Sequence, residues 1–139
     1  MPILEETKAN EVEKGGYIAL EPRNKPEGII MSSGEELHLA LEVAKRLMIK
    51  GIEVRVVSIP NLGRFLKQDP LYIESVLPVE VRKVAIEASS SMSWNKLIYN
   101  SKYLITLDEF GSSGKKEDVY KKYGFDVDTL EEKIEELLK

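Results

Sequence analysis

The chain has 139 residues, 42% hydrophobic and 32% charged, which is enough for one domain with a buried core. Its net charge of -4 argues against the basic surface that nucleic-acid-binding proteins usually carry. The absence of cysteine excludes disulfides and thiolate catalysis, and the single histidine, His38, leaves little for acid–base chemistry. No apolar run approaches the ~18 residues of a membrane span, and no signal-peptide pattern is present. We therefore expect a cytoplasmic protein that contacts neither nucleic acid nor membrane.

The first part of the chain predicts a linker followed by a short strand. Residues 1–14 are polar and acidic without a hydrophobic period, so we expect a linker or arm there and one domain over residues 15–139. Tyr17–Leu20 has the composition of a strand. The proline-containing turn over residues 21–27 is too short for a helical crossover, so this strand should pair antiparallel or lie at an edge of the sheet.

Residues 28–60 carry the strongest local pattern, a strand, a helix and a second strand. Gly28–Met31 is a short apolar run, and Val54–Ser58 is a β-branched run that ends before Pro60. Gly51 stands where a helix ends in the left-handed conformation. We expect these elements to form a parallel βαβ unit with a right-handed crossover. The apolar face predicted for the helix consists of Leu37, Ala40, Leu41, Ala44, Leu47 and Met48.

Polar residues of this helix lead to three further predictions. Ser33 and Glu36 have the spacing of a capping box at the helix start. Glu42 and Arg46 are spaced for an ion pair on the solvent side. His38 lies four residues before Glu42, so we expect it to make a solvent-side contact and to have no catalytic role.

The remaining chain alternates between short helices and strands. This alternation predicts the α/β class, as a three-layer α/β/α sandwich with a five-stranded mixed sheet whose first strand is antiparallel. We expect the last helix to start near Asp128, whose carboxylate would cap it. The other expected elements are helical turns over Asn61–Leu66 and Leu71–Leu77, strands over Val84–Glu87 and Leu104–Leu107, and helices over Trp94–Tyr99 and Lys115–Tyr123.

Two helix openings are candidate anion sites, because free backbone N–H groups and the helix dipole converge at such positions. The first is favoured by its lysines, although Asp108 and Glu109 are close enough in sequence to neutralise them. The second is disfavoured, because Glu35 and Glu36 would repel a phosphate. The first opening consists of Ser112, Ser113, Gly114 and Lys115, and the second of Ser33 and Gly34.

Neither opening fits a nucleotide-binding motif. The dinucleotide fingerprint needs three glycines, and a Walker loop would need glycine where Glu109 stands. Glu87 ends a predicted strand, the position at which α/β sheets place functional groups. We expect no catalytic, cofactor-binding or metal-binding residue in this chain.

One stretch resembles a known family. Gln68-Asp69, Tyr72 and Glu74–Pro78 are similar to the Q-D-x-x-Y-x-E-S-V-L-P run of transketolases. The resemblance extends back to Gly15 and forward to Phe125, so it covers nearly the whole chain from Gly15 on. It involves only the third, C-terminal domain of that family.

The resemblance implies a homodimeric parent enzyme of the pentose phosphate pathway that transfers a two-carbon ketol unit between sugar phosphates. In that family, thiamine diphosphate and its magnesium or calcium ion bind between the first two domains. This chain would then be an inactive scaffold and dimer-contact module that binds no cofactor itself, and residues 1–14 would be the tail of a connection from upstream domains. Ile73 departs from the family pattern, in which an arginine commonly follows the tyrosine.

Two alternatives remain open. One is an autonomous Rossmann-like regulatory module that binds a nucleotide or a phosphate at its strand ends. The other is the third domain of a related thiamine diphosphate enzyme, such as deoxyxylulose phosphate synthase. The run from Gln68 to Pro78 favours transketolase over these relatives.

Overall fold

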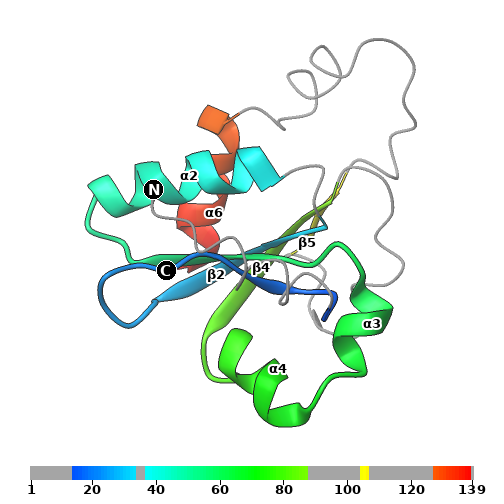
Figure 1. The fold of residues 1–139 in the computed structure, drawn as a ribbon. Coiled ribbons are helices and arrows are strands. Elements are labelled where there is room, and N and C mark those ends of the chain that lie inside the picture. The colour runs from blue at the N-terminus through cyan, green and yellow to red at the C-terminus, as the bar shows by residue number, and fades with distance from the viewer. Residues whose placement is uncertain (1–13, 34–36, 88–103, 107–126, 139) are drawn as a thin grey trace, which may run out of the picture.

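The computed structural model describes residues 14–33, 37–87, 104–106 and 127–138. These residues form a five-stranded sheet with α2 and α6 on one face and α3 and α4 on the other (Figure 1). The predicted three-layer α/β/α sandwich is therefore confirmed. The elements are β1 (Tyr17–Leu20), β2 (Gly28–Ser32), α2 (Leu37–Ile49), β3 (Val54–Ser58), α3 (Leu62–Leu66), α4 (Pro70–Val76), β4 (Arg82–Glu87), β5 (Leu104–Thr106) and α6 (Val127–Leu138).

The sheet has the order β1-β3-β2-β4-β5 and is mixed. Strands β2, β3, β4 and β5 are parallel, whereas β1 runs antiparallel to β3, with Tyr17 opposite Ser58. The antiparallel first strand was predicted from its short link to β2, and this prediction is confirmed. The strand bounds differ slightly from the predicted ones, because β2 includes Ser32 and β4 begins at Arg82.

Strands β2 and β3 are buried at every position, because helices cover both faces of the sheet. Successive side chains point to opposite faces and so enter two separate cores. Ile30 and Val56 belong to the core beneath α2 and α6. Ile29 and Val57 belong to the core above α3 and α4. This arrangement explains why apolar residues predominate in both strands, in place of an alternation of apolar and polar residues.

The buried face of α2 is rotated from the predicted one. Leu39 and Val43 are buried as well as Ala40, Ala44 and Leu47, whereas Leu37, Leu41 and Met48 are only partly buried. The physical reason is that α2 packs against α6 as well as against the sheet, so its apolar stripe is turned toward both neighbours.

The C-terminus of α2 confirms the predicted glycine cap. Gly51 has a φ of 88°, which favours glycine. Its N–H donates to the carbonyl of Met48, and the Ile52 N–H donates to that of Leu47, both at 3.0 Å. This pair of hydrogen bonds is the Schellman motif. The predicted capping box at the other end lies partly outside the described residues, because residues 34–36 are not described.

Two predictions about charged residues are corrected by the packing of α6 on α2. The Arg46 guanidinium contacts Asp128 and Glu131 of α6 in place of its predicted partner Glu42. Asp128 is not the N-cap of α6, since the helix begins at Val127 and Asp128 lies in its first turn. Two carboxylates on a neighbouring helix compete with the single one available within α2.

The two predicted helical turns are present as α3 and α4, and each begins at a side-chain cap. Asn61 caps α3, with its Oδ1 accepting the Arg64 N–H at 3.0 Å. Asp69 caps α4 by accepting the Leu71 N–H at 2.8 Å, and Pro70 occupies the first turn. Helix α4 therefore begins at Pro70, one residue before the predicted start.

The predicted helices over Trp94–Tyr99 and Lys115–Tyr123 lie outside the described residues. Within the described part of the chain, none of the helices has the length and apolarity needed to cross a membrane.

Candidate functional site

The strand order reverses between β2 and β4. From β2 the chain crosses to β3 on one side, and from β4 it continues to β5 on the other, while β2 and β4 are neighbours in the sheet. In open α/β sheets, ligands bind at such a switch point, outside the carboxyl ends of the strands. The carboxyl ends of β2 and β4 are therefore the candidate ligand-binding edge of this sheet.

Two residues singled out in the sequence meet at this edge. Ser32 ends β2 and lies in register with Ile86 of β4, so Ser33 and Glu87 follow on neighbouring strands. Ser33 is half-buried, and Ser32 is fully buried. Ser58, which ends β3, is the register partner of Ser32 on its other side. At this edge of the sheet, Ser58 ends β3, Ser32 ends β2 and Glu87 ends β4, in that spatial order.

These groups can bind a ligand but do not form a catalytic set. Serine hydroxyls donate and accept hydrogen bonds, and Ser32 and Ser58 end β2 and β3 at this edge. Histidine 38 is exposed on α2. Among the described residues, no three His, Cys, Asp or Glu side chains are grouped so that they could hold a metal ion.

The structure leaves the two predicted anion sites largely untested. Ser112, Ser113, Gly114 and Lys115 lie outside the described residues, as does Gly34. For the second opening, the structure places only Ser33, at the carboxyl end of β2.

The Q-D-x-x-Y-x-E run makes its polar contacts within the domain. Four of its side chains have partners close in space, so the run has a structural role. Gln68 Nε2 donates to the Arg64 carbonyl at 3.1 Å, Asp69 accepts the Leu71 N–H at 2.8 Å, Tyr72 donates to the Gly16 carbonyl at 2.8 Å, and Glu74 accepts the Val79 N–H at 3.2 Å.

The N-terminal part of the chain meets the domain on α3 and α4. Asn61 donates its backbone N–H to the Gly15 carbonyl at 3.1 Å, and the Tyr72 hydroxyl donates to the next carbonyl, that of Gly16. The Lys14 ammonium lies 4.2 Å from the centre of the Tyr72 ring. These contacts place the first described residues against the α3–α4 pair.

Sequence reasoning missed the role of Arg55, which is only 9% exposed in β3. Its guanidinium bonds both carboxylate oxygens of Glu21 at 2.8 Å, and its Nη1 donates to the carbonyls of Ser75 and Val76 at 3.1 and 2.9 Å. A buried arginine needs such partners. The sequence does contain an indication of this role, since Arg55 is a charged residue within an otherwise largely apolar strand and a buried charge needs a partner.

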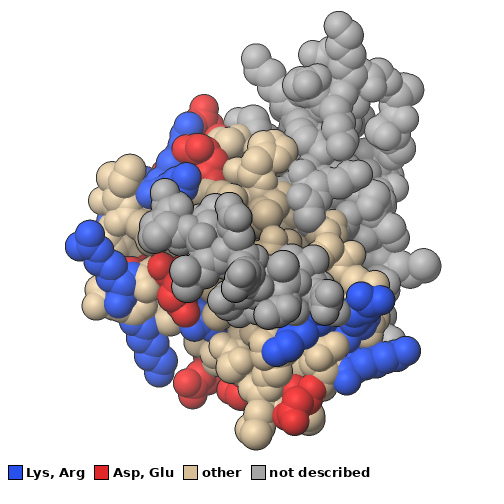
Figure 2. All heavy atoms as spheres, viewed as in Figure 1, with Lys and Arg blue, Asp and Glu red and all other residues tan. Residues whose placement is uncertain are grey.

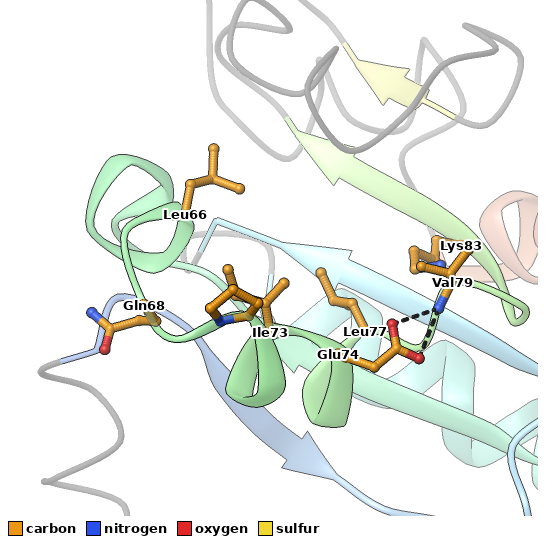
Figure 3. A pocket seen from close by; sticks show the side chains of 8 residues that line it. Leu66, Gln68, Ile73, Glu74, Leu77, Val79 and Lys83 are labelled. Atoms are coloured by element: carbon orange, nitrogen blue, oxygen red, sulfur yellow. Dashed lines mark hydrogen bonds between the residues drawn. The ribbon is translucent and has the colours of Figure 1, made fainter.

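A hollow of about 310 Å³ lies beside α3 and α4 (Figure 3). Lys83 and Glu74 lie on its rim. Burial lowers the pKa of Lys83, while the Glu74 carboxylate opposes this shift. The apolar wall of this surface, the α3–α4 hollow, consists of Leu66, Pro70, Ile73, Leu77 and Val79.

Comparison with known proteins identifies the family. A family model described as the transketolase-like TK C-terminal domain matches residues 15–126. The transketolase of Nostoc sp. is 40% identical over 139 residues, which cover 99% of this chain and 21% of the relative. The transketolase of Buchnera aphidicola is 40% identical over 131 residues, or 94% of this chain and 20% of the relative. The chain thus spans about a fifth of the length of these relatives.

Solved structures agree. Transketolase from Pichia stipitis in complex with sedoheptulose-7-phosphate has a TM-score of 0.80 and 33% identity, covering 99% of this chain and 20% of that one. Transketolase from Campylobacter jejuni has a TM-score of 0.78 and 32% identity, covering 90% of this chain and 19% of that one. Because the family match, the identities and the fold all point to the same part of one enzyme, this chain belongs to the family of transketolase C-terminal domains.

Proposed function

We propose that this chain works as the C-terminal scaffold domain of a transketolase that transfers a two-carbon ketol unit between sugar phosphates. The observation that carries this proposal is the 40% identity of 99% of the chain to one-fifth of the Nostoc enzyme. The substrate class follows from relatives, because Pichia stipitis transketolase has been solved with xylulose-5-phosphate and with sedoheptulose-7-phosphate.

The proposed division of labour places the chemistry outside this domain. Thiamine diphosphate, with a magnesium or calcium ion, would supply the ketol-transfer chemistry on the upstream domains of a cytoplasmic homodimer. What supports this view is that the matching family model is that of a C-terminal domain, that the chain spans about a fifth of its relatives, and that the family run makes intradomain contacts.

The domain's own residues keep the domain rigid and fix its position relative to the preceding chain. Arg55 links β3 to Glu21, in the turn after β1, and to the end of α4. Tyr72 fixes the incoming chain through Gly16. A rigid scaffold keeps neighbouring domains within the sub-ångström tolerance that positioned catalysis requires.

A fusion experiment tests the proposal. The 139-residue chain replaces the matching C-terminal part of Nostoc transketolase, and ketol transfer from xylulose-5-phosphate is measured with thiamine diphosphate and magnesium present. We expect activity well above that of the Nostoc enzyme truncated before this domain. A folded fusion no more active than the truncated enzyme would contradict the proposal.

The isolated chain provides the complementary test. Calorimetric titration of the 139-residue chain with thiamine diphosphate and magnesium should show no saturable heat, because the proposed cofactor site lies on other domains. A saturable isotherm in the micromolar range would contradict this division of labour.

A further inference from the structure

The α3–α4 hollow presents apolar side chains to solvent. Leu71, next to Pro70 of its wall, is 81% exposed, and Val79 is 84% exposed. Only one other large hydrophobic among the described residues is comparably exposed, Ile49 at 86%, at the end of α2. A hollow with Val79 in its wall, and with Leu71 exposed on the same helix α4 that supplies Pro70 and Ile73 to that wall, is a surface typical of contact with another protein.

The polar groups of the hollow are already engaged within the domain. A small polar ligand would have to displace these hydrogen bonds, whereas an apolar protein surface could cover the hollow and leave them intact. The engaged groups are Glu74, which accepts the Val79 N–H at 3.2 Å, Lys83, which donates to the Pro78 and Val81 carbonyls at 2.7 and 2.8 Å, and Gln68, which donates to the Arg64 carbonyl at 3.1 Å (Figure 3).

The surroundings of the hollow are charged. Lys and Arg side chains lie over α3 in the view of Figure 2, and Arg64 and Lys67 of that helix region are exposed. Glu74 and Glu80 are exposed near the other end of α4. An apolar centre with a charged rim is the usual anatomy of a protein–protein interface.

The direction of the chain indicates which protein surface this is. Lys14, Gly15 and Gly16 contact the same two helices, so the described part of the chain begins against α3 and α4. In the Nostoc relative this domain makes up 21% of the chain, and the matching family model is that of a C-terminal domain. In such relatives the larger part of the enzyme therefore comes before the position of Lys14.

We propose that the α3–α4 hollow is the surface on which the preceding domains of a transketolase dock. The inference rests on the proposed function, and it adds the location of the contact. An apolar side chain of the preceding domain fills the hollow, and Leu71 and Val79 lie at the margin of the buried contact. The opposite face, with Ile49 at the end of α2, stays outside it.

The Nostoc fusion described above allows a direct test by hydrogen–deuterium exchange. Backbone amides of residues 66–79 should exchange at least about tenfold more slowly in the fusion than in the isolated chain. Amides around Ile49 should exchange equally in both. Equal exchange over residues 66–79 in the two proteins, or protection confined to the Ile49 face, would overturn the docking surface.

Three matched substitutions sharpen the test. Leu71→Glu and Val79→Glu should leave the urea midpoint of the isolated chain unchanged, because both side chains are exposed there. In the fusion they should abolish the protection of residues 66–79. Ile49→Glu, at an equally exposed site, should leave that protection intact. Equal effects of all three substitutions would overturn the proposal.

Activity and protection report on different claims. A fusion that transfers ketol units without protection of residues 66–79 overturns the docking surface and leaves the proposed function standing. A fusion with that protection but without activity supports the docking surface and counts against the proposed function. A fusion with neither counts against both.

Discussion

Arg55 and Glu21 form a bidentate ion pair. The Arg55 Nε donates to Oε1 of Glu21 and its Nη2 donates to Oε2, each at 2.8 Å. The remaining nitrogen, Nη1, donates to the Ser75 and Val76 carbonyls at the end of α4. One side chain therefore connects the edge strand's turn, a central strand and a helix C-terminus, where a cation is also favoured by the helix dipole.

Replacing Arg55 with methionine should lower the free energy of unfolding by about 1–3 kcal/mol, because the buried Val76 carbonyl and the part-buried Ser75 carbonyl lose their donor. Glu21→Gln should cost less, about 1 kcal/mol, since an amide oxygen can still accept and water reaches this half-exposed site. Urea denaturation of both variants and of the double variant measures the two costs and their coupling. Equal costs for the two single variants would show that the carbonyl contacts contribute little.

Gly51 and Gly15 form a matched pair for testing backbone strain, since both have a φ of 88°. A Cβ at Gly51 meets no atom within 4 Å, so Gly51→Ala should cost only the conformational penalty of about 1–2 kcal/mol. A Cβ at Gly15 would collide with the Asn61 carbonyl oxygen and lie 2.5 Å from the Phe65 backbone nitrogen. Gly15→Ala should therefore lower the urea midpoint further, and equal midpoints would contradict this reasoning.

Stability should fall in acid through Glu131. Its hydrogen bond with Lys50 lowers the pKa of the Glu131 carboxyl below its ordinary 4.5, with help from Arg46. The unfolded chain then takes up a proton at a higher pH than the folded one, so stability rises with pH in this range. The contribution is complete above pH 4.5 and is lost as the pH falls through the folded pKa.

The pH dependence has a matched control on the same helix. Glu131→Gln should flatten the decline of the urea midpoint below pH 4.5. Glu132→Gln removes the same charge from an exposed neighbouring position and should leave the decline intact. A decline that Glu131→Gln does not alter would assign the acid sensitivity to other groups.

A phosphate titration followed by amide NMR ranks the two predicted anion sites. Saturable shifts centred on residues 112–116 would support the first opening, where Lys115 and Lys116 favour an anion unless Asp108 and Glu109 neutralise them. At Ser33 and Gly34, an acidic side chain within ~4 Å costs phosphate about 1 kcal/mol even in water-like dielectric, which offsets the helix dipole. Shifts centred on residues 33–36 would reverse the ranking, and the absence of localised shifts would rule out both sites.

Sequence alone determined the features that depend on neighbours a few residues apart. Glycine 51 ends α2 as predicted, because a helix cap depends only on the capping residue and the adjacent turn of backbone. The antiparallel β1 follows from a link too short for a crossover. The run from Gln68 to Pro78 indicates the family through residue types and spacing alone.

Only the tertiary structure decided which distant residues meet. Arg46 has Glu42 one turn away, yet it pairs with Asp128 and Glu131, because α6 lies along α2. Arg55 finds Glu21 because β1 folds back beside β3. Local spacing cannot reveal these partners or the α3–α4 hollow, since they depend on how helices and strands pack across the sheet and not on any pattern within one element.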